Sequence, residues 1–163
     1  TARHMYDSGQ KSGVACESVS AGMRTTLAQK SHDGVSSARV GRQAAELIEV
    51  LVHDKSAMQE SPLILDLGNN NRLTRDEVST VFEVVKDQPQ IIVVNTAVPR
   101  SWRDPNNALI TEFAIQYPNA TVVDWKAISA GHPEYFGPDG VHLVPAGINA
   151  YVDAIMNVLL PIK

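Results

Sequence analysis

The chain has 163 residues, of which 44% are hydrophobic and 20% are charged, and its formal net charge at pH 7 is −4. That length and composition fit one globular domain with a sizeable core, and the lack of a Lys/Arg run argues against a nucleic-acid partner. No apolar run approaches the roughly 20 residues that a membrane-spanning helix needs. The single cysteine, Cys16, excludes an internal disulfide.

The first residues are polar and show no period, so we expect residues 1–11 to be a linker or an expression remnant and residues 12–163 to be a single domain. From residue 12 onward, short apolar runs alternate with stretches of helical periodicity, which is typical of βα units and a parallel sheet. Strands are predicted at 14–16, 35–40, 63–67, 91–95 and 121–123, and helices at 21–29, 44–52, 74–85, 104–117 and 145–159. The sequence therefore predicts a three-layer α/β/α sandwich around about five parallel strands, with ligands at the carboxyl ends of the strands.

Three of the helices carry start signals. Thr74 and Glu77 form a capping box, in which each side chain accepts the other residue's backbone N–H. Asp104 is predicted to cap a helix that has Pro105 in its first turn, and Pro145 is predicted to open the last helix.

Asp139 and His142 are three residues apart in the loop before the last helix. In a catalytic triad, a carboxylate fixes the tautomer of the imidazole and stabilises the imidazolium that forms when the base takes a proton. The pair predicts a general base that needs a nucleophile from elsewhere in the chain. A solvated loop before a helix is the alternative interpretation.

Three further residues follow predicted strands and have types that acyl transfer needs. Ser18 lies where a strand turns into a helix, so it is a candidate nucleophile or simply a helix cap. The backbone N–H groups of Gly41 and Ser18 and the side-chain amide of Asn70 could bind a developing oxyanion. The alternatives are ordinary turn residues, and the asparagine run 69–71 leaves the choice among the amides open.

The order Ser, Gly, Asn and Asp-x-x-His resembles the SGNH hydrolase superfamily, whose conserved blocks supply these residues in this order and whose fold is flavodoxin-like. The segments 98–102, 123–125, 131–136 and 139–143 resemble the extracytoplasmic C-terminal domain of peptidoglycan O-acetyltransferases and related membrane acyltransferases. The likeness covers roughly residues 13–160.

This resemblance implies acetyl transfer through an acetyl-serine intermediate, with Ser18, His142 and Asp139 as the triad. The expected acceptor is the 6-hydroxyl of N-acetylmuramoyl residues in the cell wall, and the donor would come from a membrane acyltransferase domain. The resemblance further implies a monomeric domain on the extracytoplasmic face of the membrane, without a metal or an organic cofactor.

Other residues in these segments are candidates for substrate binding. Arg100 and Trp102 could line a sugar cleft, although Arg100 could instead brace its loop against an acid. His132 could contact substrate or be structural. Asp124 and Trp125 are expected to anchor the last strand.

One block departs from the family pattern. The superfamily usually has Gly-Asp-Ser where this chain has Cys16-Glu17-Ser18, which leaves the Cys16 thiol as a rival nucleophile. Two alternatives to a transferase therefore stay open: a carbohydrate acetylesterase or small-ester hydrolase with the same triad, and a non-catalytic carbohydrate-binding domain.

Overall fold

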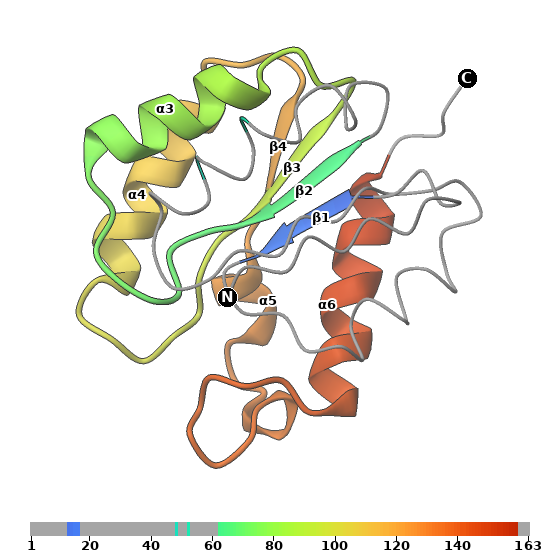
Figure 1. Cartoon of the computed structure of the whole chain (residues 1–163). Helices are drawn as coiled ribbons and strands as arrows, with labels where there is room; N and C mark the ends of the chain where they lie inside the picture. Colours follow the sequence, from blue (N-terminus) through green and yellow to red (C-terminus); the bar gives the residue numbers. More distant parts are fainter. Residues whose placement is uncertain (1–12, 17–47, 49–51, 53–61, 160–163) are drawn as a thin grey trace.

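The computed structural model describes residues 13–16, 48, 52 and 62–159. Within them, four parallel strands form one sheet in the order β1-β2-β3-β4 (Figure 1). The strands are β1 (Gly13–Cys16), β2 (Leu63–Asp66), β3 (Ile91–Val94) and β4 (Ala120–Val123). Each agrees within one residue at either end with a predicted strand, so the predicted parallel α/β fold is confirmed. The strand predicted at 35–40 and the helix at 21–29 lie outside the described residues.

The strands end in register. Cys16, Asp66, Val94 and Val123 are the last residues of their strands, and each pairs with the next across the sheet. Because the strands are parallel, the segments that follow them emerge at one edge of the sheet, where the sequence predicts the site.

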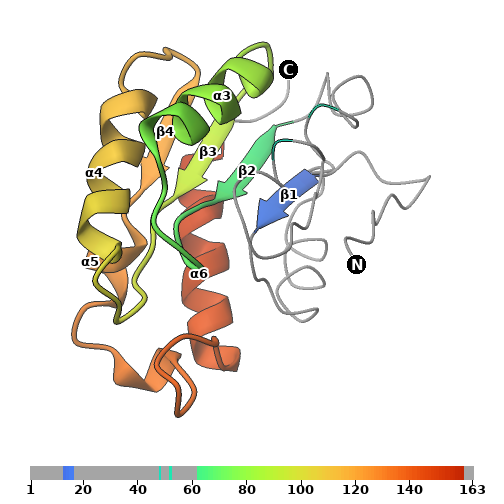
Figure 2. The same cartoon turned by 60° about the vertical axis from the view of Figure 1, so that its left-hand side comes forward.

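Helices cover both faces of the sheet (Figure 2). The odd-numbered residues Leu63 and Leu65 pack toward α3 (Arg75–Val85) and α4 (Arg103–Ala114), whereas Ile64 packs toward α6 (Pro145–Val158). Successive side chains of a strand point to opposite faces, so β2 and β3 are buried along their whole length. Of the helix predicted at 44–52, Ile48 and Val52 are described, and both are helical.

Two predicted helix starts are confirmed. The Thr74 hydroxyl accepts the Glu77 N–H at 3.1 Å, and the Glu77 carboxylate accepts the Thr74 N–H at 3.0 Å. Pro145 is the first residue of α6.

Among the described residues, no helix combines the length and the apolar character that a membrane crossing would require.

The predicted cap at Asp104 is wrong. α4 begins one residue earlier, at Arg103, and the preceding residue Trp102 provides no side-chain cap. The Asp104 carboxylate instead bonds the side chains of Arg103 and Lys126, each at 2.9 Å. Two cations outcompete the N–H groups of the helix for this acid.

β4 is followed by α5 (Trp125–Ser129) and a 3-10 turn (Pro133–Tyr135) before α6. Asp124 caps α5 by accepting the Ala127 N–H at 3.1 Å, and Trp125 is buried in the core under α6. These two residues anchor the end of β4, as the sequence predicts.

Gly147 lies where the first turn of α6 crosses the 3-10 turn. A Cβ at this position would overlap the Tyr135 carbonyl oxygen and lie 2.9 Å from its carbonyl carbon. The same carbonyl accepts the Val144 N–H at 3.0 Å, just before the helix begins. Glycine therefore permits the contact that holds the 3-10 turn against α6.

Replacing Gly147 with alanine tests this contact. In an open helix the change would be stabilising, but here the overlap should lower the free energy of unfolding by about 1–3 kcal/mol. Urea denaturation measures the effect. The control is Asn149→Ala on the exposed side of the same helix, for which we expect no loss; equal stabilities of the two variants would contradict the packing argument.

Candidate active site

Asp139 and His142 lie in a short hairpin between the 3-10 turn and α6. One antiparallel bridge joins Phe136 to Leu143, and the Gly137 N–H donates to the His142 carbonyl at 2.8 Å. The hairpin thus closes directly beside the predicted base, whose backbone is fixed by these bonds.

Within the hairpin, one carboxylate organises the loop. Gly140 turns the tip with a φ of +70°, which favours glycine. Asp139 Oδ1 then accepts the N–H groups of Val141 at 2.9 Å and of His142 at 3.0 Å, while Oδ2 bonds His142 Nδ1. With Nδ1 engaged, Nε2 is the nitrogen left to take a proton, and the His142 side chain is 77% exposed. This is the carboxylate–imidazole arrangement that the sequence predicts.

The electrostatics of the pair favour an ionised carboxylate. The hydrogen bond from His142, followed by the backbone N–H groups of Val141 and His142, holds the pKa of Asp139 well below its usual range. An ionised carboxylate bonded to Nδ1 is the partner that the imidazole of a catalytic triad has, which is the role predicted for Asp139.

The candidate oxyanion residue Asn70 is half-buried in the loop after β2. The neighbouring amide of Asn69 is engaged, because its Nδ2 donates to Asp66 at 2.6 Å and its Oδ1 accepts the Thr96 hydroxyl at 2.6 Å. One of the two Nδ2 hydrogens of Asn69 and its Oδ1 are thus engaged within the protein, and the role of Asn70 stays a prediction.

Asn106, in the first turn of α4, holds this loop in place. Its side chain is fully buried; its Nδ2 donates to the carbonyls of Gly68 at 3.0 Å and Asn71 at 2.8 Å, and its Oδ1 accepts the Leu73 N–H at 2.8 Å. One amide thus satisfies three backbone groups that have no strand partner.

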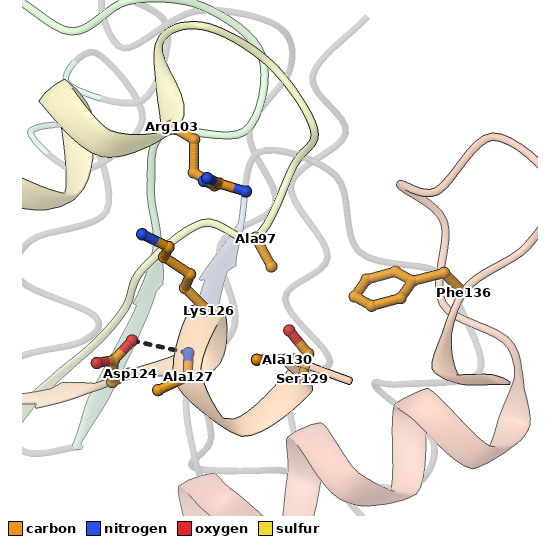
Figure 3. A pocket seen from close by; sticks show the side chains of 8 residues that line it. All are labelled: Ala97, Arg103, Asp124, Lys126, Ala127, Ser129, Ala130 and Phe136. Carbon is orange, nitrogen blue, oxygen red and sulfur yellow. Dashed lines mark hydrogen bonds between the residues drawn. The ribbon is translucent and has the colours of Figure 1, made fainter. Parts of the chain in front are cut away.

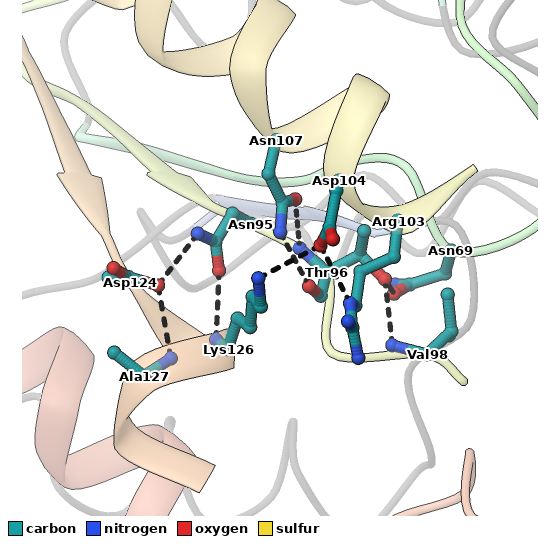
Figure 4. A network of polar contacts seen from close by, with 10 residues as sticks. All are labelled: Asn69, Asn95, Thr96, Val98, Arg103, Asp104, Asn107, Asp124, Lys126 and Ala127. Carbon is teal, nitrogen blue, oxygen red and sulfur yellow. Dashed lines mark hydrogen bonds and ion pairs between the residues drawn. The ribbon is translucent and has the colours of Figure 1, made fainter. Parts of the chain in front are cut away.

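The loops after β3 and β4 are tied in the same way (Figure 4). The Asn107 side chain bonds both the N–H and the carbonyl of Thr96, at 2.9 and 2.8 Å. Asn95 donates to Asp124 at 2.9 Å and accepts the Lys126 N–H at 3.0 Å. Side-chain amides therefore join the segments that follow neighbouring strands.

A buried carboxylate connects this network to α6. Asp66 is 6% exposed; it accepts the Tyr151 hydroxyl at 2.9 Å as well as the Asn69 amide. The loop after β2 and the helix that follows the His142 hairpin are thereby joined.

Sequence reasoning missed Asn106, Asn107, Asp66 and Tyr151. A signal was present for the first two, since adjacent asparagines in the first turn of a helix favour hydrogen bonds to nearby backbone over helix formation. Asp66 ends a strand whose other residues are apolar, so it also stood out as a polar group that would need a partner.

The three candidate substrate-binding residues lie in the described part of the chain. Arg100 is exposed and donates to the Pro99 carbonyl at 3.0 Å, which is not the acid that the bracing interpretation requires. The Trp102 indole donates to the Asn69 carbonyl at 3.3 Å. His132 stacks on Tyr135 with ring centroids 4.5 Å apart. Their contact with substrate stays a prediction.

The predicted nucleophile Ser18 and oxyanion residue Gly41 lie outside the described residues, as does Glu17. The structure brings together Asp139 and His142 and places Asn70 after β2, at the same edge as the end of β1. In the part of the chain that is described, no three His, Cys, Asp or Glu side chains form a group that could hold a metal ion.

A carboxyl titration tests the Asp139–His142 pair. Because the pKa of Asp139 is lower in the folded protein than the roughly 3.9 of an unfolded aspartate, the pair stabilises folding above that pH and loses this effect as the pH falls toward the folded value. In a ¹³C NMR titration, His142→Ala should move the Asp139 pKa back up toward its ordinary value. An unchanged pKa in this variant would exclude His142 as the main cause.

The hydrogen bonds of Asn106 to the loop after β2 can be tested separately. Asn106→Ala leaves buried backbone groups without partners and should lower the free energy of unfolding by about 2–3 kcal/mol. Urea denaturation measures this, with Thr111→Ala on the exposed side of α4 as the control. Similar, small losses in both variants would show that water replaces the amide at little cost.

Comparison with known proteins identifies relatives of the chain, although no family model matches it. It is 40% identical over 121 residues to the peptidoglycan O-acetyltransferase OatA of Listeria monocytogenes, a match that covers 74% of this chain and 19% of that protein. It is 33% identical over 142 residues to the putative peptidoglycan O-acetyltransferase YrhL of Bacillus subtilis, over 86% of this chain and 22% of that protein. The chain thus spans about a fifth of the length of these relatives.

Solved structures agree on the fold. The C-terminal catalytic domain of OatA from Streptococcus pneumoniae superposes with a TM-score of 0.70 at 22% identity, covering 93% of this chain and 94% of that one. An acetyl xylan esterase from Geobacillus stearothermophilus superposes with a TM-score of 0.66 at 15% identity, covering 94% of this chain and all of that one. Together with the sequence matches, this makes the chain a homologue of one segment of the OatA peptidoglycan O-acetyltransferases, with the SGNH-type hydrolase fold that its sequence blocks predict.

Proposed function

We propose that residues 12–163 form a catalytic domain that transfers acetyl groups to a cell-wall carbohydrate through an acetyl-serine intermediate. The observation that carries this proposal is the Asp139–His142 dyad, found in a chain that is 40% identical over 121 residues to a peptidoglycan O-acetyltransferase. The His142 side chain is mostly exposed, which suits a base that serves an external substrate.

In the proposed reaction, Ser18 Oγ attacks the acetyl carbonyl of the donor while His142 Nε2 takes its proton. The backbone N–H groups of Ser18 and Gly41 and the Asn70 amide bind the oxyanion. Collapse of the tetrahedral intermediate expels the donor's leaving group, which takes the proton from His142. The acceptor hydroxyl then attacks the acetyl-serine and loses its proton to His142, which returns it to Ser18.

The names of the relatives support peptidoglycan as the acceptor class. The acceptor would be the 6-hydroxyl of N-acetylmuramoyl residues, contacted by Arg100, Trp102 and His132. The donor would be supplied by a membrane acyltransferase domain, which places this monomeric domain at the extracytoplasmic face of the membrane. The match to a fifth of longer O-acetyltransferases supports an additional domain of this kind.

Three alternatives to a transferase with Ser18 as its nucleophile stay open. The same residues would make an esterase if water replaced the sugar, and the fold neighbours include an acetyl xylan esterase. The unusual Cys16-Glu17 pair before Ser18 favours a non-catalytic carbohydrate-binding domain, or a Cys16 nucleophile.

Turnover of an aryl acetate, with and without a muroglycan oligomer, separates these possibilities. Ser18→Ala and His142→Ala should each lower turnover by a similar factor, on the order of a thousandfold to a millionfold, because a triad acts as a unit. Cys16→Ala is the control for the rival nucleophile and should retain activity. Acetylated oligosaccharide, detected by mass spectrometry, is the expected product.

Each alternative has its own signature in this experiment. Steady acetate release without acetylated sugar would make the protein an esterase. Equal turnover by wild type and Ser18→Ala would exclude Ser18 as the nucleophile, and a loss confined to Cys16→Ala would assign that role to the thiol.

A further inference from the structure

A half-open cavity of about 370 Å³ lies at the carboxyl ends of β3 and β4 (Figure 3). Arg103 and Lys126 lie on one side of it, and the Phe136 ring faces them from the other. The remaining lining residues are mostly small and apolar: Ala97, Asp124, Ala127, Ser129 and Ala130. The cavity therefore has a cationic wall and an apolar floor.

The cationic wall has unused hydrogen-bonding capacity. Arg103 Nε and Lys126 Nζ both donate to the same oxygen, Asp104 Oδ1, at 2.9 Å. These two bonds lower the pKa of Asp104 to about 2. A single carboxylate thus forms ion pairs with two cations. Among the described residues, the two terminal amino groups of Arg103 have no acceptor, and the side chain is 34% exposed.

One oxygen of the acid that lines the cavity, Asp124, is engaged in hydrogen bonds. Asp124 Oδ1 accepts both the Asn95 amide at 2.9 Å and the Ala127 N–H at 3.1 Å, where it caps α5. Asp124 is thus held at the start of α5, and among the described residues Arg103 forms its ion pair with Asp104 and not with Asp124.

The hairpin that carries the candidate base also contributes a residue to the cavity wall. Phe136 is bridged to Leu143, the neighbour of His142. The tip of the same hairpin approaches the loop after β3, since a Cβ on Gly140 would lie 3.5 Å from the Pro99 ring. A glycan with one hydroxyl at His142 could therefore place a neighbouring substituent in the cavity.

We propose that this cavity binds a carboxylate carried by the acceptor glycan, through the two terminal amino groups of Arg103 with Lys126 beside it. A planar guanidinium pairs with a carboxylate through two parallel hydrogen bonds, and the alanines and Phe136 would contact the carbon atoms next to it. The inference rests on the proposed function. The carboxylate could belong to the lactyl group of N-acetylmuramic acid or to the peptide that it carries.

Three ligands distinguish these sources: N-acetylglucosamine, which lacks the lactyl group; N-acetylmuramic acid; and N-acetylmuramoyl-L-alanyl-D-isoglutamine, whose carboxylate is on the peptide. Chemical shifts of ¹⁵N-labelled protein report binding at Ala97, Ala127 and Ala130. At least one carboxylate ligand should bind about tenfold more tightly than N-acetylglucosamine, as expected for a charged hydrogen-bonded pair.

Arg103→Gln should abolish this preference, and Lys126→Met should weaken it. Lys86→Gln removes the same charge from the end of α3 and should leave the preference intact. The proposal is overturned if Arg103→Gln keeps the preference, if the shifts map elsewhere, or if no carboxylate ligand is preferred. Binding does not require transfer, so a wild type that binds as expected but acetylates no glycan would refute only the proposed function.

Discussion

The backbone N–H and carbonyl groups of the loops at the carboxyl edge of the sheet need hydrogen-bond partners outside the strands. The arrangement of these loops depends on the side chains that provide those partners. Strands that end in register place their following loops side by side, beyond the reach of the strand ladder. Side-chain amides satisfy these loops: Asn106 for the loop after β2, Asn107 for the loop after β3 and Asn95 for the start of α5. An unsatisfied buried group would cost about 1–3 kcal/mol, so the amides fix the loops as well as fill the space.

The same network relates the two halves of the candidate site. Tyr151 bonds the buried Asp66, and Asp66 bonds Asn69 in the loop that carries Asn70. Four residues before Tyr151 on the same helix, Gly147 packs against the 3-10 turn that leads into the His142 hairpin. The hairpin and the asparagine loop are therefore held against one helix, which gives the site a rigid frame.

The contrast between local and distant partners explains what the sequence could predict. The capping box at Thr74 and the Asp139–His142 contact each join residues three apart, and both contacts are present because short spacing leaves few alternative geometries. The catalytic role of the pair stays a prediction. Asp104 failed as a cap because Lys126, 22 residues away, competes for its carboxylate. Asn106 was missed because its partner Leu73 is 33 residues away. Ser18 and Gly41 stay predictions.

The exposure of His142 bears on the choice between transfer and hydrolysis. With a side chain that is 77% exposed, this candidate base is open to water. Exclusion of water by the described residues would then contribute little to selecting a sugar over water as the acceptor. The selection would depend on holding the sugar hydroxyl at His142, because a bound and oriented acceptor reacts at an effective concentration that bulk water does not match. In such an enzyme, the groups that bind the acceptor decide the reaction as much as the triad does.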